Sequence, residues 1–366
     1  MLNRMRNTFI WVVLWGVAGL VACSPVPAAT LADLSAPKAK ATEVAVAVAD
    51  LSPETGGGDD GAPLATPVGG GTGSLVFVSD RNGPWDLYLL TLGVDPNAPG
   101  VVERLTASET YEWSPVWSPD GQRLAYYSDV NGNVDLFMLS TETGFGVPER
   151  LTDHSGYDAD PAWSPDGQAL VFMSDRDGNP ELYTLRLGEY LPTRLTDSPA
   201  IDTLPDWSAL LGGYIAFVSD RDGNPEIYVM PAMAGAVPLR LTFDAGDDLY
   251  PAWSPDGLWL AFSSNRAGNA DIYVLDVMKA LRGEGTTPIR VTSATSNEWY
   301  PAWSADGQWL SFVAQDGENA NLFTLPTTLV IGSAAANDVR VPDLSRYAPF
   351  WLTRNPLGDV APAWQP

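Results

Sequence analysis

The sequence predicts an all-β fold: a six-bladed β-propeller closed by the C-terminal strand and preceded by a signal peptide and a disordered tether. A pattern of about 49 residues recurs six times between residues 74 and 366, which is the size of one propeller blade. The chain has 34 glycines and 31 prolines, and this content favours turns and short strands over long helices. Residues 362–366 also supply one strand with no blade after it.

Residues 1–22 are expected to be a lipoprotein signal peptide. Arg4 and Arg6 precede an apolar run over residues 9–22, which is shorter than the about 20 residues that a membrane-spanning helix needs. The run ends before Cys23, the only cysteine of the chain, in a sequence that resembles bacterial lipoprotein signals. This resemblance implies cleavage before Cys23 and a lipid on its thiol. The alternative is an ordinary signal peptide or an uncleaved anchor.

Residues 23–73 are expected to form the lipidated Cys23 and a flexible linker. Ala, Pro and Gly make up 25 of the 50 residues at 24–73, and none of the 50 is aromatic. Such a segment cannot bury enough apolar surface to become ordered. The propeller is therefore expected outside the cytoplasm, anchored by lipid to a bacterial membrane, in the periplasm or on the cell surface.

Each repeat within residues 74–366 is expected to hold four short strands. The first is Pro-Ala-Trp-Ser, which leads into a Ser-Pro-Asp-Gly turn. The second alternates apolar residues, as at 170–173, and ends at a turn such as Asp-Arg-Asp-Gly. The third starts with an acid or Asn and continues as Leu/Ile-Tyr/Phe, and Arg-Leu-Thr is the fourth.

The ends of the repeat region predict how the ring closes. The first repeat lacks its Pro-Ala-Trp strand, and residues 362–364 supply one. We expect this strand to complete the blade whose other strands lie within residues 74–106. Closure of this kind removes the open edges of a linear array, and a chain with one cysteine has no intramolecular disulfide to do so.

These motifs resemble the TolB-type β-propeller family, whose WD40-like, PD40-type repeats read Arg-Leu-Thr, an acid, Pro-x-Trp-Ser-Pro-Asp-Gly, Ser-Asp-Arg-Asp-Gly and Ile-Tyr. The Pro-Ala-Trp-Ser-Pro-Asp-Gly motif is complete at residues 161–167 and 251–257. The resemblance covers nearly all of residues 74–366 and implies a propeller that binds other proteins of the cell envelope. TolB carries an α/β domain before its propeller, and residues 24–73 stand in that place here.

Composition excludes several classes of activity. The formal net charge of −25 argues against nucleic-acid binding, which needs a basic surface. One cysteine and one histidine exclude a Cys/His zinc site, and a His-dependent catalytic triad would have to use His154. Similar repeats form the propeller half of prolyl-oligopeptidase-like enzymes, but residues 1–366 leave no room for a hydrolase domain beside the propeller, and we expect none. We therefore expect no enzyme activity, no catalytic residue and no cofactor.

Residues that recur in every blade are expected to serve the fold. An acid stands three positions before each repeat proline, and we expect each acid to bind its own loop or a repeat arginine rather than a metal. The acids are Glu112, Asp158, Asp202, Asp248, Glu298 and Asp359. The arginines are Arg81, Arg104, Arg150, Arg176, Arg194, Arg221, Arg240, Arg266 and Arg290.

Two further repeated features are also interpreted as structural. The tryptophans of the Pro-x-Trp strands are expected in the core between blades: Trp117, Trp163, Trp207, Trp253, Trp303 and Trp364. The Asp-rich turns that begin at Asp80, Asp129, Asp175 and Asp220 are weak candidates for calcium. They lack the remaining acids of a calcium loop, so no metal is expected.

Function is expected where the blades differ. The six loops between each repeat threonine and proline hold twelve acids and one arginine. Aromatic residues in or beside these loops are expected to be exposed and are candidates for binding a protein or peptide of the envelope. They are Trp85, Tyr111, Trp113, Tyr157, Phe243, Trp299 and Tyr300. Alternatively, several of them pack in the mouth of the channel.

Two other functions stay open at this point. The same aromatics could stack on sugar rings of a polysaccharide. A hydrolase using rim carboxylates, with or without a divalent ion, would need acids that have no counterpart in sister blades. Those acids are Glu109, Asp153, Asp160 and Asp247. In all three cases we expect a monomer that contacts the membrane only through its N-terminal lipid.

Overall fold

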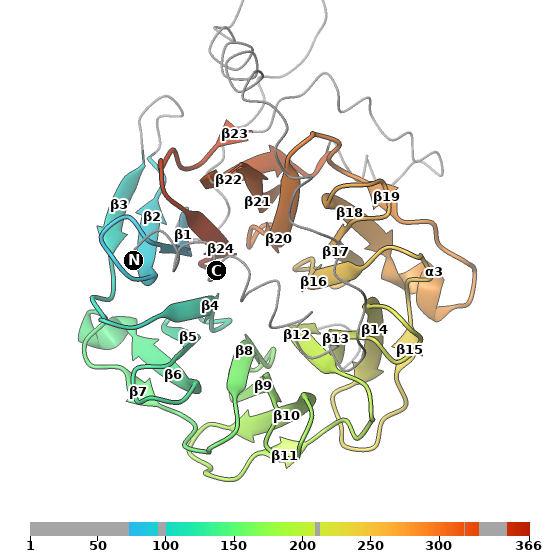
Figure 1. Cartoon of the computed structure of the whole chain (residues 1–366), viewed down its shortest axis with the longest axis horizontal. Helices are drawn as coiled ribbons and strands as arrows, with labels where there is room; N and C mark the ends of the chain where they lie inside the picture. Colours follow the sequence, from blue (N-terminus) through green and yellow to red (C-terminus); the bar gives the residue numbers. More distant parts are fainter. Residues whose placement is uncertain (1–72, 94–99, 209–212, 318, 329–349) are drawn as a thin grey trace, which may run out of the picture. The chain divides into compact units, whose positions relative to one another are not determined.

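The computed structural model describes residues 73–93, 100–208, 213–317, 319–328 and 350–366. The predicted signal peptide at 1–22, Cys23, the linker up to residue 72 and most of residues 326–349, a long connection in the last repeat, lie outside these residues. The described residues form six antiparallel sheets of four strands each, arranged as a ring (Figure 1). This confirms the predicted all-β, six-bladed propeller. Within the described ranges, no helix has the length and apolar composition needed to cross a membrane.

The first blade contains both ends of the repeat region. Strand β24 (Asp359–Trp364) pairs antiparallel with β1 (Ser74–Ser79), which is followed by β2 (Asp86–Thr91) and β3 (Val101–Arg104). In this register, Leu75 lies opposite Trp364 and Ser79 lies opposite Asp359. The predicted closure by the C-terminal strand is therefore confirmed.

The other five blades have four consecutive strands each, with the first strand at the channel and the fourth at the outer rim (Figure 1). Blade 2 holds β4 (Glu112–Trp117), β5 (Arg123–Ser128), β6 (Asp135–Ser140) and β7 (Glu149–Arg150), and blade 3 holds β8 (Asp158–Trp163), β9 (Ala169–Ser174), β10 (Glu181–Arg186) and β11 (Thr193–Arg194). Blade 4 holds β12 (Asp202–Ser208), β13 (Tyr214–Ser219), β14 (Glu226–Pro231) and β15 (Leu239–Arg240). Blade 5 holds β16 (Asp248–Trp253), β17 (Trp259–Ser264), β18 (Asp271–Asp276) and β19 (Ile289–Arg290), and blade 6 holds β20 (Asn297–Trp303), β21 (Trp309–Asp316), β22 (Asn319–Pro326) and β23 (Phe350–Trp351).

The innermost strand of each blade differs from the prediction in where it starts. It starts at or one residue before the repeat acid, three or four residues ahead of the proline, so the proline lies in mid-strand. Each of these strands has a register shift at the proline, and the residue before the proline has a positive φ of 48–56°. A proline is tolerated there because a bulge leaves its residue outside the ladder of hydrogen bonds.

The repeat tryptophans pack between neighbouring blades, as predicted. Trp117, Trp163, Trp253, Trp303 and Trp364 are buried, and Trp207 is half-buried. Several indoles also donate a hydrogen bond to the preceding blade: Trp163 Nε1 lies 3.1 Å from the Val116 carbonyl, and Trp303 Nε1 lies 3.0 Å from the Ala252 carbonyl. The blades are thus joined by both apolar packing and directed hydrogen bonds.

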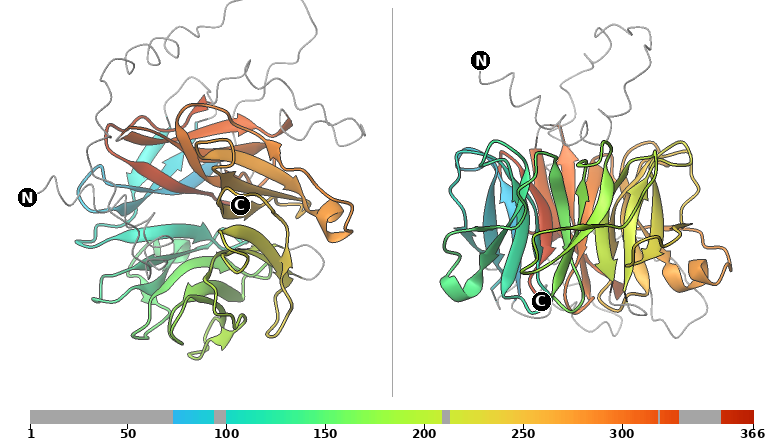
Figure 2. Two further views of the ribbon diagram at one scale, coloured as in Figure 1. Left: turned by 45° about the vertical axis from the view of Figure 1, so that its right-hand side comes forward. Right: turned by 90° about the horizontal axis from the view of Figure 1, so that it is seen from below.

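The disc has two faces, seen edge-on in Figure 2. We call the end that carries the loops between repeat threonine and proline the loop face. The opposite end, with the Ser-Pro-Asp-Gly turns, is the turn face. The short helices η1 (Thr141–Thr143) and α3 (Val277–Leu281) follow the third strands of blades 2 and 5 on the turn-face side (Figure 2). In the long connection at 276–287, Asp276 caps α3 and Val277 is buried.

Candidate functional site

The repeat acids of the innermost strands bind arginines of the second turn in four blades. Asp158, for example, is fully buried and accepts bonds of 2.8 and 2.9 Å from Arg176 Nη2. The same pair recurs as Asp202–Arg221, Asp248–Arg266 and Asp359–Arg81. In each pair the guanidinium also lies over the ring of the third-strand tyrosine, such as Tyr183 at 4.9 Å from the Arg176 Cζ atom. These acids therefore serve the fold, as predicted.

A second set of ion pairs joins the third strand of a blade to its fourth. The acid at the start of the third strand is fully buried and bonds to the arginine of Arg-Leu-Thr or its variant. The five pairs are Asp86–Arg104, Asp135–Arg150, Glu181–Arg194, Glu226–Arg240 and Asp271–Arg290. In blade 6, Asn321 and Trp351 stand at the two positions, so the acid and the arginine are lost together. All nine repeat arginines have a carboxylate partner.

Two innermost acids have no arginine, and both are glutamates. Glu112 instead accepts a hydrogen bond from the Thr106 hydroxyl, and Glu298 accepts one from Ser296 Oγ at 2.9 Å. The arginine position is Val130 in the blade of Glu112 and Asp316 in the blade of Glu298. Burial without a neutralising cation raises the pKa of each glutamate to about 7.

The Asp-rich turns bind backbone amides of the loop face. Asp129 Oδ1 accepts the Tyr111 N–H at 3.0 Å, and Asp175 Oδ1 accepts the Tyr157 N–H at 2.7 Å. Asp80 and Asp220 accept the N–H groups of Gly358 and Ile201 in the same way. These carboxylates therefore fix the approach of the chain to the innermost strand. The asparagine four residues after Asp175 donates two bonds to carbonyls of the loop that leads into the next blade.

The seven candidate aromatics do not form one exposed surface. Phe243 is 74% exposed on its loop, and Tyr157 is 39% exposed. Trp113 lies inside β4, is only 7% exposed and packs on the half-buried Trp85 with ring centroids 5.1 Å apart. The expectation of an exposed side chain is therefore wrong for Trp113, because the strand starts earlier than the motif suggests.

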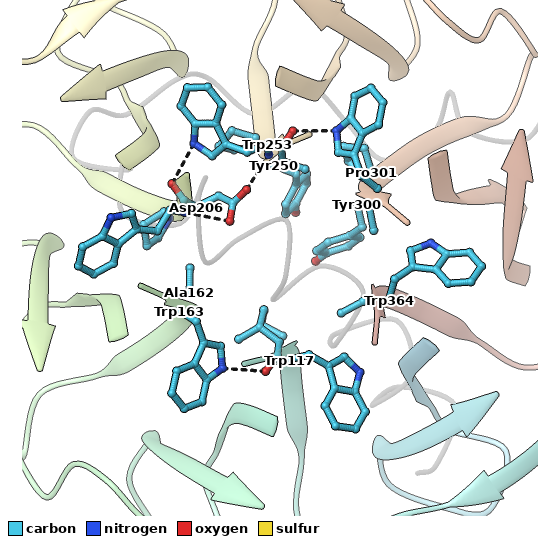
Figure 3. Close-up of a pocket in the computed structure, with 18 of the residues that line it drawn as sticks. Trp117, Ala162, Trp163, Asp206, Tyr250, Trp253, Tyr300, Pro301 and Trp364 are labelled. Carbon is cyan, nitrogen blue, oxygen red and sulfur yellow. Dashed lines mark hydrogen bonds between the residues drawn. The ribbon is translucent and has the colours of Figure 1, made fainter. Parts of the chain in front are cut away.

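The remaining candidates are half-buried. Tyr111 ends its loop next to β4, whereas Trp299 and Tyr300 lie within β20. Tyr300 points into the channel, where its ring lies 4.1 Å from that of Tyr250 (Figure 3). Partner binding by these residues stays a prediction, and Phe243 and Tyr157 are the two of the seven whose side chains are exposed.

The channel holds a cavity of about 450 Å³ between the bulges and the turn face. Its wall is built by the six Pro-x-Trp segments, which converge on the axis of the ring (Figure 3). The six residues with positive φ begin this wall, and they differ from blade to blade: Ser114, Asp160, Leu204, Tyr250, Tyr300 and Ala361. The same backbone conformation thus presents five kinds of side chain in six blades, so the repeat itself does not dictate these residues.

Asp160 is the acid at this level of the channel. Ser114 Oγ of the neighbouring blade donates to its Oδ1 at 3.0 Å, and burial raises the pKa of Asp160 to about 6. Burial raises the pKa of the Tyr250 hydroxyl to about 12, and the Asp160 charge adds to this rise. The charge acts in the same direction on Tyr157 and Tyr300, so the carboxylate lies near hydroxyls of three blades.

A second channel acid, Asp206, was missed by the sequence reasoning. Its carboxylate accepts the backbone N–H of Trp253 at 2.7 Å and that of Trp207 at 3.0 Å, so it joins blades 4 and 5 (Figure 3). The signal was available: Asp206 occupies the middle of Pro-x-Trp, where the other blades have Val or Ala. Both oxygens are held by amides, so this acid is structural.

The other residues considered for catalysis are dispersed. His154 is exposed, and its Nδ1 accepts the Gly156 N–H at 2.9 Å in a loop turn. Asp153 pairs with Arg150 at 2.7 Å, and Glu109 is exposed in another loop. Of the four acids predicted to lack sister-blade counterparts, Asp160 alone lines the cavity of the channel.

The fold and channel define a six-bladed propeller of the kind built from TolB-like repeats. Residues 102–249 match the family model described as the TolB beta propeller domain, which confirms the resemblance predicted from the repeats. TolB from Acinetobacter baumannii is 22% identical, with a TM-score of 0.62 over 80% of this chain and 66% of that chain. The chain thus spans about two thirds of that protein.

Two further solved structures share the propeller. A protein described as TolB from Agrobacterium tumefaciens is 23% identical, with a TM-score of 0.53 over 69% of this chain and 84% of that one. An oligogalacturonate lyase solved in complex with manganese is 18% identical, with a TM-score of 0.50 over 70% and 71% of the two chains. At these identities the likeness concerns the fold, which serves binding proteins and enzymes alike.

Proposed function

We propose that this protein is an extracytoplasmic propeller, anchored by a lipid on Cys23, that binds a protein or peptide partner of the cell envelope and performs no chemistry. The observation that supports partner binding best is the loop face, where Phe243 and Tyr157 are exposed among acidic loops. Exposed aromatics on a rigid frame form binding hot spots because they lose little conformational entropy when they are covered. The match to the TolB beta propeller domain supports the same class of function.

The location follows from the sequence rather than from the ring. The apolar run before Cys23 and the composition of the linker up to residue 73 support export and lipid anchoring. The acidic net charge favours a basic or neutral partner over an anionic surface.

The test compares two exposed aromatics on opposite faces. The full-length protein and its Phe243→Ala and Tyr190→Ala variants would each be used to capture partners from envelope extract. Tyr190 is 94% exposed in the turn-face loop of blade 3 and is the matched control. A polypeptide that the wild type and Tyr190→Ala enrich but Phe243→Ala loses, and that then binds purified protein saturably, supports the proposal.

Three other results contradict it. Loss with Tyr190→Ala alone would move the binding surface to the turn face. Equal capture by all three proteins would remove the loop-face aromatics from the site. Saturable binding of a purified envelope glycan, with no polypeptide captured, would instead establish the polysaccharide function.

A further inference from the structure

The cavity of the channel has the size and shape of a small-ligand site. About 450 Å³ lies within the range of pockets that hold small organic molecules, and the wall is mostly proline and tryptophan. The polar groups of the wall are few and come from particular blades. A small number of such groups fixes the orientation of a bound ligand and makes the site specific. The cavity lies toward the turn face, away from Phe243, and so does not depend on the proposed partner surface.

The cavity is chemically asymmetric in a way that six-fold repetition does not require. Asp160 projects from blade 3, and Tyr300 projects from blade 6, which is the opposite position in a ring of six. Tyr250 of blade 5 lies against Tyr300 (Figure 3). A carboxylate therefore faces a pair of aromatic rings across the channel.

The charge of this site is not balanced by the described residues that line it. Among the described residues that line the cavity there is no Lys, Arg or His. The nine repeat arginines are bound to carboxylates within the blades, away from the axis. A cation from outside would therefore meet the Asp160 carboxylate without competition from a basic side chain among these lining residues.

We propose that the channel binds an organic ammonium group between the Asp160 carboxylate and the rings of Tyr250 and Tyr300. A carboxylate supplies the counter-ion, and the negative faces of aromatic rings attract alkylammonium groups with little loss of hydration. The tryptophan and proline wall covers the carbon atoms that such a group carries. The source of the ammonium is either a free quaternary amine or a lysine side chain that a bound polypeptide inserts.

A metal ion fits this wall less well. In the described part of the chain no group of three His, Cys, Asp or Glu side chains stands together, whereas calcium takes six to eight oxygen ligands. Asp206, the other acid of the wall, is occupied by two backbone amides. One available carboxylate beside aromatic rings suits a bulky monovalent cation.

The test uses calorimetric titration of the full-length protein with choline, with Nα-acetyl-lysine methylamide and with 3,3-dimethylbutanol. The last compound is the neutral isostere of choline. We expect at least one ammonium compound to bind saturably and dimethylbutanol to bind at least about tenfold more weakly. Choline binding identifies a free quaternary amine, and binding of the lysine compound alone identifies a side chain delivered by a polypeptide.

The variants are chosen from residues that the fold already accepts. Asp160→Asn removes the charge and should weaken ammonium binding at least about tenfold. Tyr300→Leu copies Leu204, which has the same positive φ in blade 4, and should weaken it several-fold. Glu189→Gln removes one charge on an exposed turn-face loop and should change nothing. Thermal unfolding of each variant checks that the ring is intact.

The proposal is overturned if neither ammonium compound gives saturable heat, or if dimethylbutanol binds as tightly as choline. It is also overturned if Asp160→Asn and Tyr300→Leu, shown to be folded, bind as the wild type does. If Asp160→Asn does not fold, Tyr300→Leu and the neutral isostere decide alone. Phe243→Ala should leave ammonium binding unchanged, which separates failure of this site from failure of the proposed partner surface.

Discussion

Replacement of Arg176 by valine tests the balance between the repeat acids and their arginines. The change leaves the Asp158 carboxylate fully buried and removes both of its bonds to Arg176 Nη2. Only the Ser174 Oγ bond to Asp158, at 2.5 Å, remains from this group. Removal of one partner of a buried pair costs about 3–5 kcal/mol of unfolding free energy. The lost contact between the guanidinium and the Tyr183 ring adds to this.

The chain itself contains the compensating change. Blade 2 has valine at the arginine position and glutamate at the acid position, and Glu112 reaches the hydroxyl of Thr106. Thr152 is the corresponding threonine for blade 3. The double variant Asp158→Glu/Arg176→Val should therefore recover at least half of the loss, because the longer acid can protonate and bond to Thr152.

Urea unfolding followed by circular dichroism measures these differences, and thermal unfolding should show a drop of roughly 10 °C for Arg176→Val. Arg186→Val is the matched control, since Arg186 is exposed and pairs with Glu189 at 4.0 Å only. A loss below about 1 kcal/mol for Arg176→Val would refute the argument that the buried carboxylate needs its cation. So would a double variant no more stable than the single one.

Three further predictions concern burial and packing. The pKa of about 7 for Glu112 and Glu298 lies above the ordinary 4.5, so the folded state binds more protons than the unfolded state does. The urea midpoint of unfolding should therefore fall as pH rises from about 5 to about 8. The double variant Glu112→Gln/Glu298→Gln should flatten this dependence of the midpoint on pH. In urea unfolding, Trp163→Phe should lower the free energy of unfolding by about 1 kcal/mol more than Trp117→Phe does. The reason is that Trp163 Nε1 donates to the Val116 carbonyl, whereas Trp117 Nε1 has no hydrogen-bond partner among the described residues. Gly358→Ala places a Cβ 2.4 Å from the Trp85 ring. It should lower the free energy of unfolding by roughly 1–3 kcal/mol and shift the tryptophan fluorescence. The same change in a Trp85→Ala background should lower it much less.

Most of the fold could be predicted from the repeat motif. Four strands per blade follow from the alternation of turns and apolar pairs, and the missing first strand of blade 1 predicts the partner of β24. The structural role of the repeat acids also followed from the parallel placement of arginines. The two innermost acids without an arginine can also be recognised in the sequence, because Glu replaces Asp in both blades that lack it. The longer side chain of glutamate reaches a hydroxyl that donates a hydrogen bond to the carboxyl group.

The channel could not be predicted in the same way. Local preferences place the residue before a proline in extended conformation, yet Asp160 and its five equivalents have positive φ. This conformation is imposed by the bulge, which exists because the innermost strand starts at the acid and pairs across the blade. The direction of Tyr300 and the burial of Trp113 depend on this bulge and register, so a motif read as a loop gave the wrong exposure for Trp113.

The pairing of β24 with β1 also sets the order of events in folding. Leu75 and Trp364 meet although roughly 290 residues separate them along the chain, so this contact carries a large loop-closure entropy. Blades 2 to 6 are each built from consecutive strands and can form as the chain emerges, whereas blade 1 must wait with an open β1 edge. The protein therefore passes through a stage with five complete blades and a first blade whose β1 edge is open, the stage at which another chain could most easily add a strand.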